Sequence, residues 1–231
     1  MNIRSRIKIA CVLVPIFLAG QAEGAGIAVY SAVEFQGLQY ITKEEIAKSA
    51  GFRGVQGGVR VDIGMLEKVL SGIRAVKSYS ISSEGNRLLI RVVEKMPLMV
   101  CVFTKGKRTV LYELDSACSV ISAGSVRAWD VPYVHIQGHE NSGRCMTAGI
   151  ASFCRLMAQV RAGDPSFYTE ISEVVLRGPE AEVMLKKRKT RFRVKPERSC
   201  LERLKYIAGY LDRIRFYPDS LDVTEDRVLI R

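Results

Sequence analysis

The sequence predicts an α+β protein in which one hydrophobic N-terminal segment precedes two folded domains. The chain has 231 residues, of which 48% are hydrophobic and 26% charged. This balance is typical of a globular protein of one or two domains and excludes a wholly disordered chain. Only residues 9–20 form a long run without a polar residue, which excludes a protein with several membrane spans. The rest alternates between strand-like runs of period two and helical runs of period 3.6.

The N-terminal segment predicts export of everything that follows it. Three basic residues in a tail over residues 1–8 precede the apolar run, and such residues favour the cytoplasmic side of a membrane. From its residues alone, the segment 9–24 fits an uncleaved transmembrane signal anchor as well as a cleaved signal peptide. A buried N-terminal helix of a cytosolic protein is a further alternative. N-terminal sequencing of membrane-extracted protein separates anchor from signal peptide, because a mature chain starting near Glu23 excludes the anchor.

Residues 26–97 predict a β-α-α-β-β module, in which two amphipathic helices cover one sheet. Thr42 and Glu45 have the spacing of a capping box, which marks the start of a helix. Pro97 separates this module from residues 98–231, because proline cannot donate a backbone hydrogen bond to a strand partner. We therefore expect residues 26–97 to fold cooperatively alone, which circular dichroism of that fragment tests. The expected elements are a strand over 28–35, a helix from Thr42 to Ala50, a loop over 51–58, a helix capped by Asp62, and hairpin strands over 76–82 and 87–94.

Residues 98–231 predict a mixed β-sheet domain with two helices. The second helix should begin with Pro196 at its first position, where a missing N–H costs nothing. Its apolar face should comprise Leu201, Leu204, Ile207, Ala208, Leu211 and Ile214. The expected strands lie over 98–103, 109–114, 118–121, 132–137, 171–176, 182–186, 190–194, 221–223 and 227–231, and the first helix over 145–162.

No motif in the sequence indicates catalysis or a cofactor. His135 and His139 are four residues apart but straddle a strand end, so they should not converge on a metal. Asp115, Asp130 and Asp164 precede small residues or proline, as turn residues do. The nucleophile, phosphate-loop and dinucleotide motifs of common enzymes are missing. We therefore expect no enzyme activity, no cofactor, no metal and no small-molecule substrate.

Five cysteines would be exported with the two domains. Cys145 and Cys154 lie too far apart along one helix to form a disulfide. A bridge between Cys101 and Cys118 across adjacent strands is an alternative to buried thiols, and nothing in the sequence decides between them. The disulfide state of all five residues, Cys101, Cys118, Cys145, Cys154 and Cys200, therefore stays open.

Charge is concentrated near the C-terminus. The net charge is +11, of which residues 186–215 contribute +9. A solvated strand face, attraction to anionic lipid or an acidic partner, and nucleic-acid binding are the alternatives. Export removes access to nucleic acid, and only Phe192 interleaves the basic run 186–195, so we expect no nucleic-acid partner.

Several local motifs add to this order of elements. In the first module these are Val33-Glu-Phe35-Gln-Gly37, residues 41–46, residues 76–81 and the alternating strand from Leu88 that ends in Glu94-Lys95-x-Pro97. They resemble the FtsQ/DivIB family of cell-division proteins, in which the first module is a POTRA domain. In that family such a strand ends in Glu-Arg-x-Pro at a domain junction, so Glu94, Lys95 and Pro97 are the expected junction and Lys95 replaces the usual arginine.

The resemblance continues more weakly after Pro97. Residues 112–115 resemble the family's run that ends in Asp-x-x-Gly, but Cys118 stands in place of the glycine. Val131-Pro132 resembles the step before the central helix. Residues 221–223 resemble the closing Asp motif, with Thr224 where arginine is usual.

The resemblance implies a bitopic scaffold of the bacterial divisome in the cell inner membrane, with a cytoplasmic N-terminus and periplasmic domains. It implies small single-span coiled-coil partners of the FtsB and FtsL type, and indirect control of septum formation. It also favours the uncleaved anchor. The alternatives are another POTRA-bearing exported protein that assists outer-membrane assembly or secretion, and a basic nucleic-acid-binding protein.

The C-terminal strand pair is the predicted partner surface. No later residue in this sequence covers the outer edge of residues 227–231, and an uncovered edge offers its backbone to another strand. In the resembling family the last strands accept the FtsB-type partner in this way. The alternative is that the pair only completes the sheet and Thr224 marks a lost binding role. The predicted binding residues are Phe216, Tyr217, Arg227, Val228, Leu229, Ile230 and Arg231, with residues 227, 229 and 231 on one face.

Overall fold

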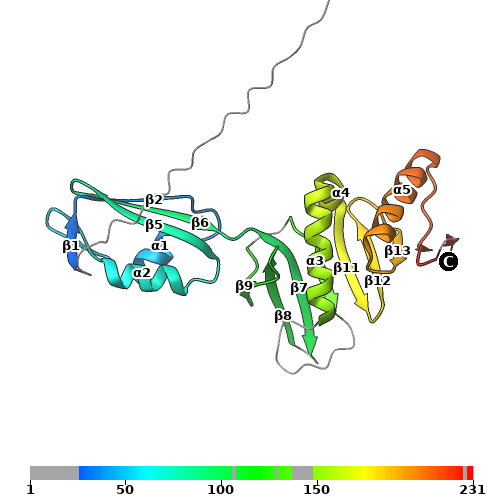
Figure 1. Cartoon of the computed structure of the whole chain (residues 1–231), viewed down its shortest axis with the longest axis horizontal. Helices are drawn as coiled ribbons and strands as arrows, with labels where there is room; N and C mark the ends of the chain where they lie inside the picture. Colours follow the sequence, from blue (N-terminus) through cyan, green and yellow to red (C-terminus); the bar gives the residue numbers. More distant parts are fainter. Residues whose placement is uncertain (1–25, 106–107, 128–129, 137–147, 226–227, 231) are drawn as a thin grey trace, which may run out of the picture.

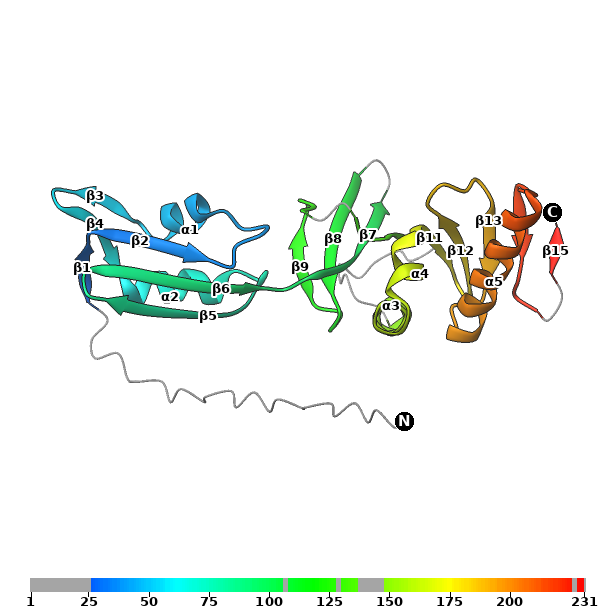
Figure 2. The same ribbon diagram turned by 90° about the horizontal axis from the view of Figure 1, so that it is seen from above.

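The computed structural model describes residues 26–105, 108–127, 130–136, 148–225 and 228–230. These residues form an elongated molecule, with residues 27–94 at one end and residues 97–230 at the other (Figure 1). Strand β6 leads into strand β7 through Lys95 and Met96 alone. The two regions are therefore consecutive along both the chain and the long axis (Figure 2).

The first region contains two three-stranded sheets, with strand orders β1-β4-β3 and β2-β6-β5. Leu66 and Leu70 from helix α2 and Ile46 from helix α1 pack on Leu88 and Ile90 of β6, and all five are buried. Burial of these side chains joins the helices to one face of the second sheet. The elements are β1 (Ile27–Tyr30), β2 (Ala32–Gln36), α1 (Lys43–Ser49), β3 (Arg53–Val55), β4 (Gly58–Asp62), α2 (Ile63–Gly72), β5 (Val76–Glu84) and β6 (Arg87–Glu94).

Both helix starts predicted from capping residues in this region are confirmed. The Thr42 hydroxyl accepts from the Glu45 backbone N–H at 3.2 Å, and the Glu45 carboxylate accepts from the Thr42 N–H at 3.1 Å. The Asp62 carboxylate accepts from the Met65 N–H at 3.0 Å. Each side chain satisfies a backbone donor that the first helical turn leaves without an intrahelical partner.

Two predictions in this region are wrong. The single strand expected over 28–35 is two strands, because the chain passes from one sheet to the other at Ser31, where both the backbone N–H and the hydroxyl donate to the Asn86 carbonyl. The loop expected over 51–58 contains β3, which pairs with β4 across the turn at Gln56 and Gly57. The observed order of the module is therefore β-β-α-β-β-α-β-β.

The second region is one nine-stranded sheet in the order β15-β14-β13-β12-β11-β10-β7-β8-β9. Strand β10 is parallel to both of its neighbours, β13 and β14 are parallel to each other, and the other pairs are antiparallel. The strands are β7 (Pro97–Lys105), β8 (Arg108–Asp115), β9 (Val120–Ala123), β10 (Tyr133–Ile136), β11 (Ile171–Arg177), β12 (Glu180–Leu185), β13 (Arg191–Val194), β14 (Ser220–Asp222) and β15 (Leu229–Ile230), and the helices are α3 (Ala148–Gly163), α4 (Pro165–Glu170) and α5 (Arg198–Ile214).

Helices α3, α4 and α5 lie along one face of this sheet (Figures 1 and 2). Phe153 and Met157 of α3, Leu204 of α5, Val183 of β12 and Phe192 of β13 are all buried in the core between the two layers. The opposite face of strands β11–β14 carries the charged side chains of those strands. In strands β11–β14 the sheet thus has one buried face and one polar face, whereas Val100 of β7 is buried in a separate cluster with Val131.

The predicted fold class is wrong as stated. It included one N-terminal membrane-spanning helix, but no helix among the described residues is long and apolar enough to cross a membrane, and residues 9–24 lie outside that part of the chain. It also assigned two helices to residues 98–231, where the structure has three. Helix α4 was missed, because Asp164 was interpreted as a turn residue although it caps the helix and Pro165 follows it. Helix α5 begins at Arg198, so Pro196 precedes the helix.

Candidate partner-binding surface

Strand β15 forms one edge of the nine-stranded sheet. Leu229 pairs with Asp222 and Ile230 with Leu221 of β14, in antiparallel register. On its other side no strand follows in the order of the sheet, within the residues that the structure describes. The backbone groups on that side are therefore available to an added strand.

Exposed apolar side chains lie on this edge strand and in the segment that leads to its neighbour β14. Val228, Leu229 and Ile230 are 43%, 51% and 63% exposed, and Phe216 and Tyr217 are 43% and 55% exposed. We call these five residues the C-terminal edge surface. A cluster of exposed aromatic and aliphatic side chains is typical of protein interfaces, because its burial by a partner removes apolar surface from water.

The structure describes five of the seven predicted binding residues, and all five are exposed. Arg227 and Arg231 lie outside the described residues, so their expected shared face with Leu229 stays a prediction. Leu229 and Ile230 are successive in one strand and point to opposite faces, and both are more than half exposed. Neither face of β15 is therefore covered by a layer of the core.

Helix α5 adds three exposed side chains that the sequence analysis missed. Tyr206, Tyr210 and Ile214 are 77%, 54% and 48% exposed and lie four residues apart, on one side of the helix. Ile214 was assigned to the buried face, but it occupies the last turn of α5, where the helix extends beyond the core. The four-residue spacing of two tyrosines outside the buried stripe was the signal in the sequence.

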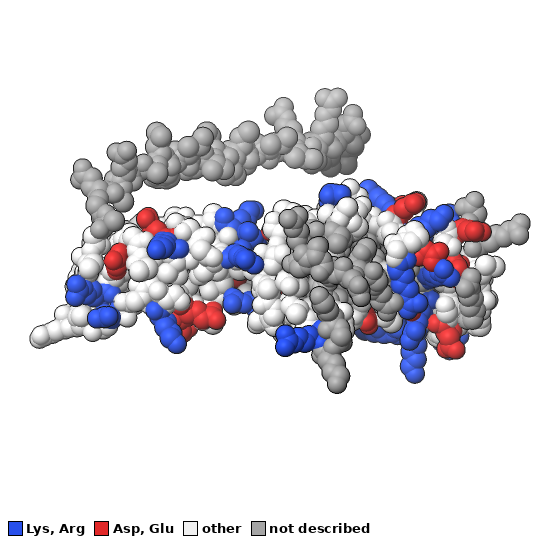
Figure 3. Space-filling model, turned by 90° about the horizontal axis from the view of Figure 1, so that it is seen from below, with Lys and Arg blue, Asp and Glu red and all other residues white. Residues whose placement is uncertain are grey.

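Neighbouring carboxylates neutralise part of the basic run near the same end. Arg188 forms two contacts with Asp212 and lies 3.5 Å from Glu170. Lys187 and Lys189 are exposed and make no ion pair with any residue in the described ranges. Lys and Arg side chains consequently lie interleaved with Asp and Glu at this end of the molecule (Figure 3).

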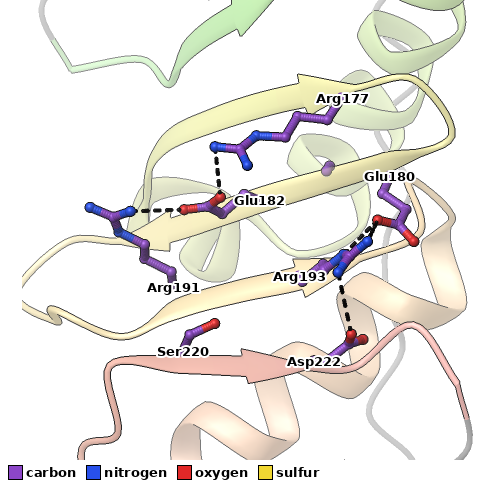
Figure 4. A pocket seen from close by; sticks show the side chains of 8 residues that line it. Arg177, Glu180, Glu182, Arg191, Arg193, Ser220 and Asp222 are labelled. Carbon is purple, nitrogen blue, oxygen red and sulfur yellow. Dashed lines mark hydrogen bonds and ion pairs between the residues drawn. The ribbon is translucent and has the colours of Figure 1, made fainter. Parts of the chain in front are cut away.

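The polar face of the sheet carries a shallow hollow of about 440 Å³ over strands β11–β14. Figure 4 shows two groups of ion pairs in it. Glu182 lies 3.3 Å from Arg177 and 3.5 Å from Arg191, while Arg193 contacts Glu180 and lies 3.9 Å from Asp222. The hydrogen bond that Arg193 donates to Glu180 raises the pKa of Arg193 above its usual value. Three cations and three anions neutralise one another, which does not favour a small charged ligand.

Glu94, the first of the predicted junction residues, has a buried carboxylate. Its two oxygens accept from the backbone N–H groups of Gln39, Tyr40 and Ile41, at 2.8, 3.0 and 3.1 Å. A buried carboxylate is stable without a cation when several donors satisfy it. Glu94 therefore fixes the loop between β2 and α1 to the end of β6.

The other predicted junction residues have simpler roles. The Lys95 N–H donates to the Ala75 carbonyl at 2.7 Å. Pro97 is the first residue of β7, a position that tolerates its missing donor. Its carbonyl accepts from Arg161 at 2.7 Å.

Gly37, which follows β2, has a φ of +82°, and a Cβ atom there would lie 2.1 Å from the Val92 carbonyl oxygen. Only glycine fits this approach.

Tyr40 and Arg127 connect the two regions, and the sequence carried no signal for this contact. Arg127 donates to the Tyr40 carbonyl at 3.1 Å and lies 4.0 Å from the Glu45 carboxylate. Its own N–H donates to the buried Glu113 at 2.6 Å. Tyr40 also packs beside Val100 in the second region. The pairing is distant in sequence, so no local pattern predicts it.

The residues weighed as catalytic or metal-binding have structural partners. His135 lies 2.7 Å from the Glu173 carboxylate on the neighbouring strand, whereas His139 lies outside the described residues. Asp115 accepts from Ala117 and Ser119 in the turn after β8. Across the described ranges, no group of three or more His, Cys, Asp and Glu side chains could hold a metal ion.

Comparison with known proteins identifies no family. No protein-family model matches the chain, and no curated protein matches it.

Proposed function

We propose that this protein is a non-enzymatic scaffold of the bacterial divisome, which acts on the periplasmic side of the inner membrane and recruits other division proteins. Its proposed partners are FtsB- and FtsL-type coiled-coil proteins. The observation that carries the proposal is the open edge of β15 with exposed apolar residues around it. The resemblance of residues 33–97 to the FtsQ/DivIB family supports the choice of partner.

Strand addition is the proposed mode of binding. A partner segment in extended conformation would pair with the free side of β15, and its side chains would contact the exposed Phe216 and Tyr217. Backbone hydrogen bonds would supply affinity, and the apolar contacts would supply selectivity. Lys187 and Lys189 are exposed near Tyr217, around a hollow of about 630 Å³, and favour an acidic partner segment.

A matched pair of proline variants tests this mode. Successive N–H groups of a strand point to opposite sides, so Leu229→Pro and Ile230→Pro each remove one donor, one facing β14 and the other facing the partner. We expect the variant that loses the N–H facing β14 to have a lower melting temperature. The variant that loses the N–H facing the partner should bind the FtsB-type protein at least about tenfold more weakly. If both variants bind as tightly as the wild type, the edge of β15 is not the binding site.

Localisation tests the cellular role separately. A fluorescent fusion should gather at the division septum, and a topology reporter after residue 231 should indicate a periplasmic position. Periplasmic signal without septal enrichment would favour a role in outer-membrane assembly or secretion. Cytoplasmic signal would leave nucleic-acid binding, which the ion pairs of Arg188, Arg191 and Arg193 make a poor fit.

A further inference from the structure

Three cysteines from separate elements converge in the core of the second region. Cys101 lies on β7 and Cys154 on α3, both fully buried, and the half-buried Cys118 lies in the turn between β8 and β9. Cys118 and Cys154 have the closest relation. The Cys118 thiol donates to the Ala151 carbonyl on α3 at 3.8 Å, and the Cys154 thiol donates to the Asp115 carbonyl in the turn at 3.6 Å.

Each thiol thus bonds to the element that carries the other cysteine. Asp115 is three residues before Cys118, and Ala151 is three residues before Cys154, so each sulfur reaches the backbone beside the other cysteine. Burial raises the pKa of the Cys154 thiol, and the neighbouring Cys118 adds to this rise. Their side chains already point toward one another, which is the main geometric requirement for a disulfide.

The backbone of Cys118 adds an independent argument. Its φ is +62°, in the left-handed region, where a residue with a Cβ atom is strained. Glycine would adopt this turn without that strain. A cysteine at this position therefore costs stability in the reduced protein, and its side chain is the feature that could offset the cost.

We propose that Cys118 and Cys154 form a redox-active dithiol pair, which is oxidised to a disulfide by exchange with an external disulfide. The inference is independent of the proposed division role. It differs from the Cys101–Cys118 bridge considered from the sequence, because the Cys118 thiol bonds to the helix that carries Cys154, and the Cys154 thiol bonds to the turn that carries Cys118.

The reaction balances in two exchange steps. The Cys118 thiolate, which is the more accessible, attacks one sulfur of a disulfide such as oxidised glutathione, and one glutathione thiolate leaves. Cys154 then loses its proton to solvent base and attacks the Cys118 sulfur, and the second glutathione thiolate leaves. Two thiols are oxidised and one disulfide is reduced to two thiols. Bond formation brings the sulfur atoms to about 2.05 Å, through a small shift of the turn toward α3.

Thiol titration and peptide mass mapping of the full chain test the pair. We use a background with Cys11→Ser and Cys145→Ser, since both residues lie outside the described part of the chain. Incubation of reduced protein with oxidised glutathione at pH 8 should remove two thiols together and yield one cross-linked peptide that joins residues 118 and 154. The melting temperature of the second region should rise by roughly 5–15 °C, because the bond restricts the unfolded chain.

Two variants and one matched control separate the pair from general thiol reactivity. Cys154→Ala should stop at a single glutathione adduct on Cys118. Cys118→Gly should give no cross-link and should melt at or above the temperature of the reduced parent, because the backbone strain is relieved. Cys200→Ala removes another buried thiol and should react as the parent does.

The rate supplies a further check. Resolution of the mixed disulfide requires the thiolate of Cys154, whose pKa is raised, so this step should accelerate by about tenfold per pH unit between pH 7 and pH 9. A cross-link between Cys101 and Cys154, or a stable glutathione adduct on Cys118 of the parent, would overturn the proposal. If Cys154→Ala fails to fold, mapping of the parent still decides between these outcomes.

Discussion

The end of β6 and the edge at β15 show two opposite ways of finishing a strand. At β6, Glu94 is buried and its carboxylate binds three backbone N–H groups, and Val92 packs its carbonyl against Gly37. At β15, consecutive apolar residues are 51% and 63% exposed and only one neighbouring strand is present in the described part of the sheet. The first site contributes to stability, whereas the second leaves its contacts to be made by another chain.

The largest effect should come from Gly37→Ala. A Cβ atom at this position meets the Val92 carbonyl oxygen at 2.1 Å, and the φ of +82° is unfavourable for alanine. We expect a loss of about 3 kcal/mol in the free energy of unfolding, measured by urea denaturation. Gly51→Ala is the matched control, because its φ is +68° with no atom within 4 Å of the added methyl group. Equal losses in both variants would show that backbone strain, and not the close approach, dominates.

Glu94→Gln should have the next largest effect. The amide keeps one oxygen as an acceptor but turns an NH₂ group toward the backbone donors that the second oxygen bound. We expect a loss of about 2 kcal/mol in the same measurement, because at least one buried N–H is left without an acceptor. Glu67→Gln, on the exposed side of α2, should change stability by less than about 0.5 kcal/mol. A neutral Glu94→Gln variant would contradict the role assigned to the carboxylate.

Ile230→Ser should have little effect on stability. The side chain is 63% exposed, so its removal exposes little additional apolar surface, and we expect a change below about 0.5 kcal/mol. Binding of the proposed partner should nevertheless fall. A loss of more than about 1 kcal/mol would show that β15 belongs to the stable core, and it would remove the contrast with β6.

The smallest effect should be a pH dependence between α4 and α5. Lys205 contacts the Asp164 carboxylate, and the hydrogen bond from Lys205 lowers the pKa of Asp164 to about 2. The ionised form is favoured in the folded state, so this stabilisation is present above the unfolded pKa near 3.8 and is lost as the pH falls toward 2.

Thermal melts of Asp164→Asn provide the comparison. Asparagine keeps the ability to cap α4 but loses the ion pair. The wild type should therefore lose more of its melting temperature than the variant between pH 5 and pH 2.5. Parallel curves would mean that the exposed pair contributes nothing measurable.

Local signals in the sequence predicted local structure well. The capping residues Thr42 and Asp62 and the hairpin turn at Gly85 each act within a few residues, and the structure has the expected elements there. The strands over residues 97–123 and the helix before Gly163 also appear, with ends shifted by a few residues. Hydrophobic periodicity identifies such elements because one side of each must be buried.

The failures involve partners that are distant in sequence. Ser31 breaks the first strand because it donates to Asn86 in the turn between β5 and β6, and β3 is an exposed three-residue strand with no apolar pattern. The Arg127–Tyr40 contact and the Glu94 hydrogen bonds also join residues more than fifty positions apart. For the candidate surface, the exposure of β15 was predicted from its place in the chain. The exposed side of α5 with Tyr206 and Tyr210 was recognised only from the structure, which shows which side of the helix is buried.

The two-residue link between β6 and β7 has a mechanical consequence. Two residues span at most about 7 Å. Beside this link, Glu94 binds the Tyr40 N–H within the first region, and Arg127 of the second region donates to the Tyr40 carbonyl. Tension applied along the long axis of the molecule would load these contacts together instead of extending a flexible tether. The region before Glu94 and the edge at β15 should therefore keep a nearly constant separation under force, as a rigid spacer does.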